Sequence, residues 1–193
     1  MLELNLHDFL ARSTENGPDQ RAVIWVQGCS LGCLGCFNPA THDSGIRRQI
    51  SVDELAEHVL AISDIEGVTI SGGEPFLQAD ALAELARRLH RAGLGILVFS
   101  GFTYEQLSQS GNPAWEKLLA ECDLLVAGPF IRERACLNAL RGSSNQTLHY
   151  LSGRYCTRKE ELEFPGSSVE ILIDEHGRVR VTGFPHKVFG DLD

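Results

Sequence analysis

The most constraining feature of this sequence is the alternation of short apolar runs with longer amphipathic stretches. Apolar runs at residues 21–28, 67–71, 95–100 and 123–127 have the length and composition of buried strands. The stretches between them have helical spacing, and the first follows a capping-box sequence at residues 51–54. Because parallel strands need such long, right-handed crossovers, the sequence predicts an α/β fold with a parallel sheet and outer helices. Helical segments are expected around residues 52–62, 82–89, 104–108 and 114–121.

The length of the chain limits the number of domains and of strand–helix units. With 193 residues, of which 43% are apolar, we expect a single domain over residues 1–193. Its core is expected at about residues 20–150, and a C-terminal extension at about residues 151–193. Four or five strand–helix units fall short of the eight that close the common barrel, which favours a partial, open β/α barrel of parallel strands.

The extension has a different pattern. Apolar runs at residues 169–173 and 178–181 lie on either side of a turn sequence that ends in Gly177. This arrangement predicts an antiparallel β-hairpin at the C-terminus, and the plainest role for such a hairpin is to close the edge of the sheet.

The charge and the N-terminal residues exclude several classes of function. A net charge of −9 argues against nucleic acid or an anionic membrane surface as a partner. Residues 1–10 lack the basic and apolar regions of a signal peptide, and no stretch has the roughly 20 apolar residues that span a bilayer. We therefore expect a cytoplasmic protein.

Half of the six cysteines fall within eight residues. Cys29, Cys33 and Cys36 form the pattern C-x3-C-x2-C in a glycine-rich loop after the first predicted strand. Three thiolates in so short a loop can hold one side of a [4Fe-4S] cluster and leave one iron open for a substrate or cofactor. His42 offers an alternative, because it could complete a zinc site with three cysteines and one histidine.

The other aromatic and sulfur-containing candidates fit ordinary structural roles. Cys122, Cys136 and Cys156 have no compact ligand spacing and are expected to be core or surface residues. Trp25 and Trp115 fall at apolar positions of a strand and a helix, so we expect them in the core.

A second motif follows the second predicted strand. Gly72, Gly73, Glu74 and Pro75 form the sequence GGEP, which alone could be a strand-to-helix turn with the proline at the first helical position. Ser100 ends the third predicted strand at the same carboxyl edge, where ligands gather in parallel sheets. Ser100 could equally begin a turn or cap the next helix.

Together, the C-x3-C-x2-C loop and the GGEP sequence resemble the signatures of the radical S-adenosylmethionine (SAM) superfamily. The resemblance implies that Cys29, Cys33 and Cys36 bind a [4Fe-4S] cluster whose open iron chelates SAM, and that reduction cleaves SAM to a 5′-deoxyadenosyl radical. It also implies that Gly72, Gly73, Glu74 and Pro75 bind SAM, with Ser100 as a further contact.

The cluster loop, with Gly before its third cysteine and Phe-Asn after it, is similar to that of the anaerobic ribonucleotide reductase activating enzymes. Residues 100–105, 124–130 and 141–146 resemble later segments of that family. The resemblance implies a glycyl radical activase that acts on a large glycyl radical enzyme and receives electrons from a low-potential donor such as flavodoxin or ferredoxin. The polar segment at residues 141–146 could contact SAM or the partner, or could satisfy only its own backbone.

Two features depart from that family, and two other functions stay open. Ala127 stands where the activases carry Asp, and residues 155–193 have no counterpart in the well-known members. The same motifs would serve a stand-alone radical SAM enzyme that modifies a peptide or small metabolite. A zinc-stabilised interaction module, or an iron–sulfur electron carrier, would make no use of Glu74.

Overall fold

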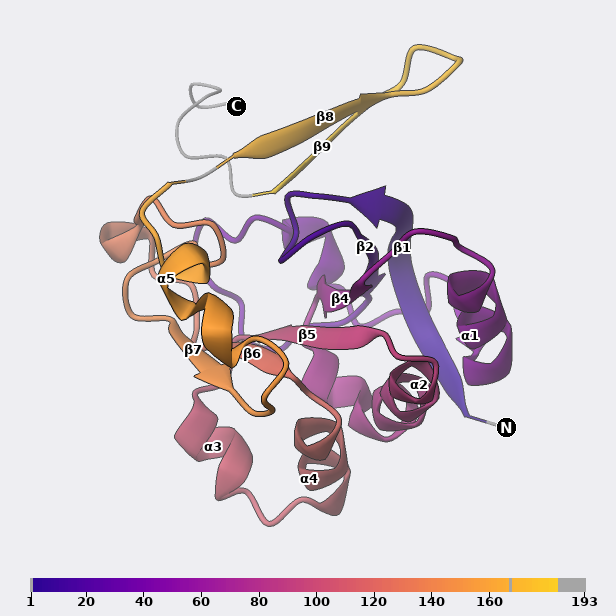
Figure 1. The fold of residues 1–193 in the computed structure, drawn as a ribbon. Helices are drawn as coiled ribbons and strands as arrows, with labels where there is room; N and C mark the ends of the chain where they lie inside the picture. Colours follow the sequence, from indigo (N-terminus) through magenta and orange to yellow (C-terminus); the bar gives the residue numbers. More distant parts are fainter. Residues whose placement is uncertain (1, 167, 184–193) are drawn as a thin grey trace.

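The fold is built on one large mixed sheet. The computed structural model describes residues 2–166 and 168–183, and within them seven strands pair in the order β3-β1-β2-β4-β5-β6-β7 (Figure 1). The strands β2, β4, β5 and β6 are parallel neighbours, which confirms the predicted α/β class. The strands are β1 (Glu3–Ser13), β2 (Arg21–Val26), β3 (Gln49–Ser51), β4 (Gly67–Gly72), β5 (Gly95–Ser100), β6 (Leu124–Ala127) and β7 (Thr147–Tyr150).

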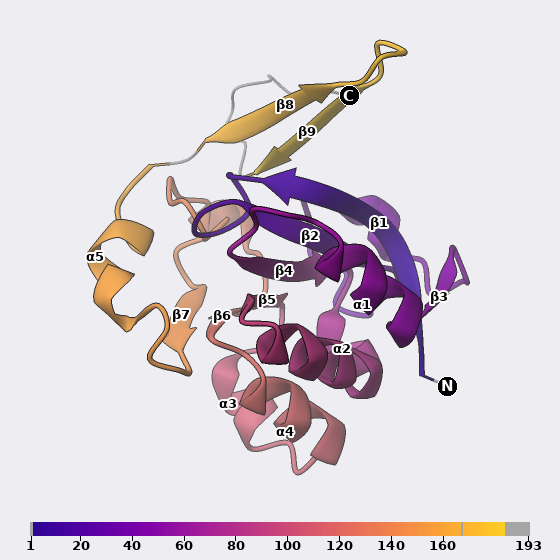
Figure 2. The same ribbon diagram turned by 45° about the vertical axis from the view of Figure 1, so that its right-hand side comes forward.

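The main helices lie on one side of this sheet, as Figures 1 and 2 show for α2 and α4. Alternate residues of the parallel strands pack against them, among them Ile24, Ile70 and Val98, and all three are fully buried. The side chain of Ser51 accepts a hydrogen bond from the Glu54 amide and caps α1, as the capping-box sequence predicts. The helices are α1 (Val52–Leu60), α2 (Ala79–Arg91), α3 (Tyr104–Ser108), α4 (Pro113–Ala120) and α5 (Lys159–Leu162), with 3-10 turns η1 (Pro39–Thr41), η2 (Pro75–Gln78), η3 (Arg132–Arg134) and η4 (Cys156–Arg158).

The purely parallel sheet expected from the sequence is wrong at both flanks. β1 and β3 run antiparallel on one side of the parallel strands, and β7 runs antiparallel to β6 on the other. β1 alternates buried Leu4 and Leu6 with partly exposed residues, which is the pattern of a half-buried strand. Its pairing with β2 is interrupted by two register shifts, so the later residues of β1 lose that alternation.

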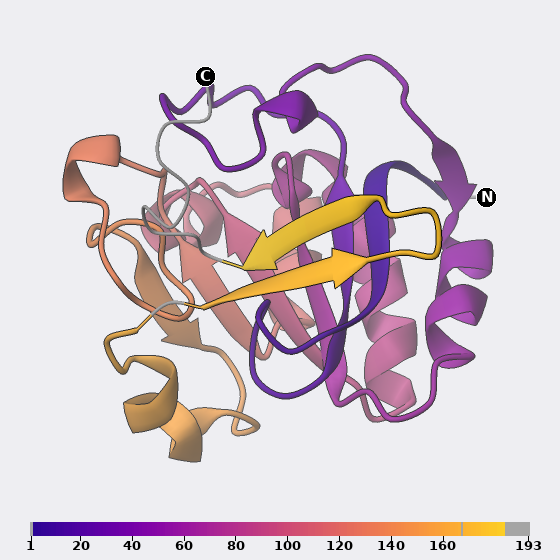
Figure 3. The same cartoon turned by 90° about the horizontal axis from the view of Figure 1, so that it is seen from above.

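The predicted C-terminal hairpin is present but does not close the sheet edge. β8 (Val169–Ile173) and β9 (Val179–Gly183) form a separate two-stranded sheet within the described residues, and Gly177 has a φ of +73° in the turn between them. Figure 3 shows the hairpin crossing over the strands of the large sheet, and Figure 2 shows it on the side opposite α2 and α4. The hairpin is thus a cover over the helix-free side.

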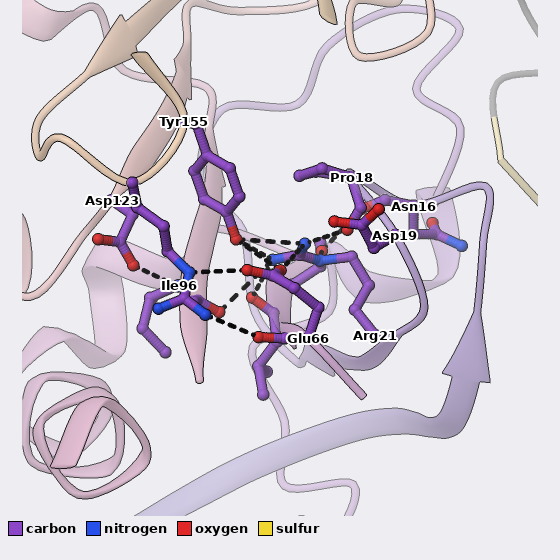
Figure 4. Close-up of polar contacts among 12 residues, drawn as sticks. Asn16, Pro18, Asp19, Arg21, Glu66, Ile96, Asp123 and Tyr155 are labelled. Carbon is purple, nitrogen blue, oxygen red and sulfur yellow. Dashed lines mark hydrogen bonds and ion pairs between the residues drawn. The ribbon is translucent and has the colours of Figure 1, made fainter. Parts of the chain in front are cut away.

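A buried arginine joins the amino ends of the strands (Figure 4). The guanidinium of Arg21 donates to the Thr69 hydroxyl at 2.7 Å and to the Pro18 carbonyl at 2.6 Å, and it pairs with Glu66 at 3.2 Å. Tyr155 donates its hydroxyl proton to Glu66 at 2.8 Å and so ties the segment before α5 to the same group. This network holds β2 and β4 together at their amino ends, opposite the end of β2 from which the cysteine loop leaves.

Candidate functional site

The cysteine loop leaves β2 at the carboxyl edge of the sheet and is held by backbone hydrogen bonds. Gly28 donates its amide proton to the Thr41 carbonyl at 2.8 Å, and the Gln27 side chain donates to the Asp43 carbonyl at 2.7 Å. Gly32 and Gly35 adopt φ values of +59° and +74°, a left-handed conformation in which glycine avoids a steric penalty. The loop therefore folds back on itself between the cysteines.

The cysteine loop and the GGEP segment are in direct backbone contact. The Glu74 amide donates a hydrogen bond of 2.9 Å to the Gly28 carbonyl. A Cβ atom on Gly73 would lie 2.2 Å from that same carbonyl oxygen, which is closer than any side chain allows. Gly73 is thus the residue type that lets the two motifs meet.

Glu74 is fully buried and bridges the ends of β4 and β5. Its carboxylate accepts hydrogen bonds from the Ser100 hydroxyl at 2.9 Å, the Gly101 amide at 2.8 Å and the Phe76 amide at 3.0 Å. Burial raises the pKa of Glu74 to about 7, because desolvation outweighs these hydrogen bonds. A cation brought beside this carboxylate would stabilise its charged form.

Ser100 fits both interpretations of its sequence position. Its hydroxyl accepts a hydrogen bond from the Phe102 amide at 3.1 Å, as a turn residue would, and it also donates to Glu74. Pro75 begins η2, a 3-10 turn, as the structural interpretation of GGEP predicts.

One cavity of about 310 Å³ collects most of the expected site residues. The three loop cysteines, Gly72, Gly73, Glu74 and Ser100 all line it, whereas Pro75 does not. The cavity lies on the helix-free side, so its floor is the carboxyl end of the parallel strands and part of its wall is β9. Ligands of parallel sheets gather at this edge.

The three thiols suit a cluster better than a single ion. Burial raises the pKa of Cys29 and of Cys36, and the neighbouring loop cysteines add to both shifts, so the thiols are close enough to interact. Yet within residues 2–166 and 168–183 no three His, Cys, Asp or Glu side chains converge as the ligands of one metal ion would. His42 also lines the cavity but does not complete such a site. Three cysteines that line one cavity fit a multi-iron cluster, whose irons bind separate thiolates.

Several cavity residues were not expected from the sequence. Trp25 is only half-buried and lines the cavity, so its assignment to the core is wrong, whereas Trp115 packs against Phe76 in the core, as expected. Trp25 and Phe99 lie on the helix-free side of β2 and β5, and strand alternation could have placed them there. A further group comes from β1 and β9, whose position over the strands has no local sequence signal: His7, Asp8, Arg180, Val181 and Thr182.

The polar segment at residues 141–146 satisfies part of its own backbone and also binds the preceding loop, where the side chains of Asn145 and Gln146 donate to the carbonyls of Pro129 and Gly128. The Gln146 side chain accepts from the Gly142 amide at 2.8 Å and the Ser143 amide at 3.1 Å. Gly142 and Gln146 also line the cavity, so the segment forms part of its wall. Ala127, where the activases carry Asp, is buried against the helix-covered core and does not line the cavity.

The other cysteines lie away from the cavity. Cys122 is buried in the core, Cys136 is half-buried and Cys156 is exposed, as expected for residues without a shared site. All six thiols are free. None of the helices in the described part of the chain is long and apolar enough to cross a membrane.

Comparison with known proteins agrees with this site. A family model described as a 4Fe-4S single cluster domain matches residues 15–149, which is more than half of the chain. Together with the cavity, the match defines an iron–sulfur protein of the radical SAM class, whose cofactors are a [4Fe-4S] cluster and SAM. The chain belongs to the family of 4Fe-4S single cluster domains.

Two curated relatives show how far the similarity extends. The chain is 38% identical over 132 residues to the pyruvate formate-lyase-activating enzyme of Staphylococcus aureus (strain USA300). It is 31% identical over 132 residues to the enzyme of the same name from Staphylococcus epidermidis (strain ATCC 12228 / FDA PCI 1200). Each match covers 65% of this chain and 53% of the relative, so the chain spans about half the length of the curated relatives it matches.

Proposed function

We propose that this chain is a radical SAM activase that generates a glycyl radical on a large partner enzyme. The observation that carries the proposal is the meeting of the three loop cysteines, the GGEP backbone and Glu74 in one cavity at the carboxyl ends of the parallel strands. The names of the curated relatives support the same class of activity.

Each site residue has a role in this proposal. Cys29, Cys33 and Cys36 would hold a [4Fe-4S] cluster, and Gly72 and Gly73 would give SAM access to the strand backbone. When bound and reduced, the cluster supplies the electron that cleaves SAM to a 5′-deoxyadenosyl radical. Pro75, which begins η2, would act only by shaping the backbone after Glu74.

Glu74 would bind the SAM ammonium group. Glu74 lines the cavity and is fully buried. Within the part of the chain that the structure describes, its carboxylate accepts hydrogen bonds only from neutral donors, namely Ser100, Gly101 and Phe76. An ammonium group would supply the missing positive charge and form a charge-assisted hydrogen bond. Ser100 would then orient the carboxylate and contact SAM at the same edge.

The topology supports an open barrel that admits a macromolecule. β2, β4, β5 and β6 are adjacent in chain order with helices on one side, which is the winding of a barrel rather than of a sheet covered by helices on both faces. In this proposal residues 1–193 would form one such domain. A partner loop that enters from the helix-free side would exclude water from the cavity. An enzyme that acts on a small substrate would need more protein of its own to do this.

The partner is proposed to be a glycyl radical enzyme of the anaerobic ribonucleotide reductase or pyruvate formate-lyase type. The first follows from the cysteine-loop resemblance, and the second from the names of the relatives. A low-potential flavodoxin or ferredoxin would supply the electron.

The decisive experiment is anaerobic reconstitution of the protein with iron and sulfide, followed by electron paramagnetic resonance after dithionite reduction. A cluster signal that changes on addition of SAM, with 5′-deoxyadenosine as product, is expected. A carbon-centred radical on purified ribonucleotide reductase or pyruvate formate-lyase would then identify the partner. Bound zinc, or a cluster indifferent to SAM, would overturn the proposal, and turnover of a small metabolite without any partner protein would favour a stand-alone enzyme.

A further inference from the structure

β1 contains a β-bulge where it passes the cavity. Leu6 pairs with Val26 of β2 and Asp8 pairs with Trp25, so β1 advances by two residues where β2 advances by one. His7 is therefore the extra residue of the bulge. Because a bulge interrupts the alternation of a strand, two successive side chains of β1 can lie on one side of the sheet.

The bulge places His7 and Asp8 on the cavity wall. Both residues line the cavity, whereas Leu6 before them and Phe9 after them pack against the helix-covered core. With regular alternation, Asp8 would face the core together with Leu6. Bulges often re-aim a side chain beside a functional site, and this one adds two polar side chains to the cavity.

Of these two side chains, Asp8 is already used by its neighbours. Its carboxylate pairs with Arg180 of β9 at 2.9 Å and accepts a hydrogen bond from the Phe9 amide at 2.8 Å. The His7 ring has one hydrogen bond, which joins its Nδ1 atom to the Gln27 side-chain oxygen at 2.6 Å. In the described part of the chain the His7 Nε2 atom has no hydrogen-bond partner, and it stays accessible to solvent. His7 therefore has a polar atom left for a ligand.

Gln27 determines which nitrogen of His7 carries the proton. The Gln27 amide nitrogen donates to the Asp43 carbonyl at 2.7 Å and to the Ala40 carbonyl at 3.3 Å. The amide oxygen of Gln27 therefore faces His7, and this oxygen can only accept a hydrogen bond. His7 Nδ1 is thus the donor, and in the neutral ring Nε2 holds a lone pair that can accept a hydrogen bond from a ligand.

The wall that carries His7 is joined to the GGEP segment. Gln78, the last residue of η2, donates from its side chain to the Gln27 carbonyl at 3.0 Å and to the Asn5 carbonyl at 3.1 Å. The Gln27 amide also donates to the Asn5 carbonyl at 2.8 Å, and η2 begins directly after Glu74. His7 and Glu74 therefore belong to one hydrogen-bonded frame and line the same cavity.

The chemistry of SAM identifies what His7 can bind. In the proposed function the cluster and Glu74 hold the amino-acid end of SAM, so the adenosine end lies against the rest of the cavity wall. Adenosine offers neutral hydrogen-bond donors, namely its ribose hydroxyls and its adenine amino group. A neutral imidazole acceptor suits such donors. Gln146, another acceptor on the wall, is already used by the amides of Gly142 and Ser143.

We propose that His7 is a SAM-binding residue whose Nε2 atom accepts a hydrogen bond from the adenosine moiety, and that Gln27 is the positioning residue that holds the His7 ring. This inference rests on the proposed function and adds to it a residue of β1. His7 lies outside residues 15–149, which the family model matches, so the match does not assign it a role.

The first test substitutes the two ring nitrogens separately. Asparagine can still donate to Gln27 from near the Nδ1 position, whereas glutamine places a polar atom near Nε2. Isothermal titration of the reconstituted, oxidised protein with SAM measures affinity without cleavage. His7→Asn should bind SAM about fivefold more weakly, and His7→Gln should stay within about twofold of the wild type. His58→Asn, at an exposed histidine of α1, is the matched control and should bind as the wild type does.

The opposite order of affinities would overturn the proposal. If His7 acted only through Gln27, His7→Asn would keep its affinity for SAM and His7→Gln would lose it. Equal affinity of both variants and the wild type would show that His7 does not contact SAM.

A second measurement uses the wild-type protein, so it does not depend on the folding of a variant. Diethyl pyrocarbonate modifies accessible imidazole nitrogens, and mass spectrometry separates His7 from His58 because each is the single histidine of its tryptic peptide, residues 1–12 and 49–87. SAM at about ten times its Kd should slow modification of His7 about tenfold and leave His58 unchanged. Unchanged modification of His7, or equal protection by methionine alone, would refute a contact with the adenosine moiety.

Binding of SAM by the wild-type protein separates the two proposals. If the reconstituted protein does not bind SAM, the proposed function is wrong. If it binds SAM and forms 5′-deoxyadenosine while His7 stays unprotected, only the role of His7 is wrong.

Discussion

The Ser100 hydroxyl donates a 2.9 Å hydrogen bond to the Glu74 carboxylate, and this bond joins the ends of β5 and β4 at the floor of the cysteine cavity. Because Glu74 would contact the SAM ammonium group and Ser100 would orient the Glu74 carboxylate, we expect substitution of Glu74 to reduce SAM affinity more than substitution of Ser100. Glu74→Gln should weaken SAM binding about 10- to 100-fold, because a charge-assisted hydrogen bond to the ammonium group contributes about 1.5–3 kcal/mol. Ser100→Ala should cost about 1 kcal/mol, or roughly fivefold. Isothermal titration of the reconstituted variants with SAM measures both, and a Glu74→Gln protein with unchanged affinity would contradict the assigned role.

The loop cysteines should differ sharply from a cysteine outside the cavity. Single Ser substitutions at Cys29, Cys33 or Cys36 should remove the reconstituted cluster, since serine is a poor ligand for iron in such clusters. Cys156→Ser should keep full iron content, because Cys156 is exposed and does not line the cavity. Iron and sulfide analysis with visible absorption provides the comparison. Equal iron content in all four variants would show that the cluster lies elsewhere.

Gly73 should tolerate no side chain. In Gly73→Ala the new methyl group would lie 2.2 Å from the Gly28 carbonyl oxygen, so the cysteine loop must move away from the GGEP segment. We expect a loss of stability of about 1–3 kcal/mol and reduced SAM-dependent change of the cluster signal. Gly153→Ala is the control, because nothing lies within 4 Å of that site. Thermal unfolding and electron paramagnetic resonance of both proteins test the difference.

Arg21 should be a stability residue without a direct part in SAM binding. Arg21→Met leaves Thr69 and the partly buried Glu66 without their guanidinium partner, and loss of one member of a buried ion pair typically costs about 3–5 kcal/mol. Tyr155→Phe removes only the hydroxyl that donates to Glu66 and should cost about 1 kcal/mol. Urea unfolding gives both free energies. A smaller effect for Arg21→Met than for Tyr155→Phe would refute this account.

His90 should make stability depend on pH. Burial lowers the pKa of His90, but hydrogen bonds to Asp123 at 2.8 Å and Glu121 at 3.0 Å outweigh burial and raise it above the ordinary 6.5. Because the pKa is raised on folding, this stabilisation is full below about pH 6.5 and is lost as pH rises through the folded-state pKa.

The wild-type protein should therefore lose about 1 kcal/mol, or about 2–4 °C of Tm, between pH 6 and pH 9 relative to His90→Gln. The pKa of Asp123 is lowered on folding, so its own contribution changes only at acidic pH and stays constant over this range. The test is to measure Tm for both proteins at several pH values between 6 and 9. A difference in Tm that stays constant over this range would contradict the assigned role of His90.

Local patterns predicted the parallel strands and the helices between them to within a few residues. The run at residues 67–71 became β4, and the amphipathic stretch around residues 82–89 became α2, because each buries one face against its neighbours in the chain. β1 was missed because its later half is irregular and only partly buried, so that half lacks the alternation of a half-buried strand.

The sequence predicted the motifs of the candidate site but not the other residues that line the cavity. The three cysteines and the GGEP sequence can be recognised from their spacing. Both follow parallel strands, so the sequence also predicts that they meet at the carboxyl edge of the sheet, where the cavity lies. The position of β9 depends on the contact of Arg180 with Asp8, which lies 172 residues away, and no local pattern encodes such a pairing.

The antiparallel strands at both flanks limit how this fold can enlarge. β1 lies beside the first parallel strand and β7 beside the last, so neither flank offers a parallel strand to which another strand–helix unit could be added. Added enclosure has to come from elements placed over the helix-free side of the strands, as β8 and β9 are (Figure 3). In this architecture, insertions and extensions over the cavity are therefore where new substrate ranges can arise, while the sheet beneath stays unchanged.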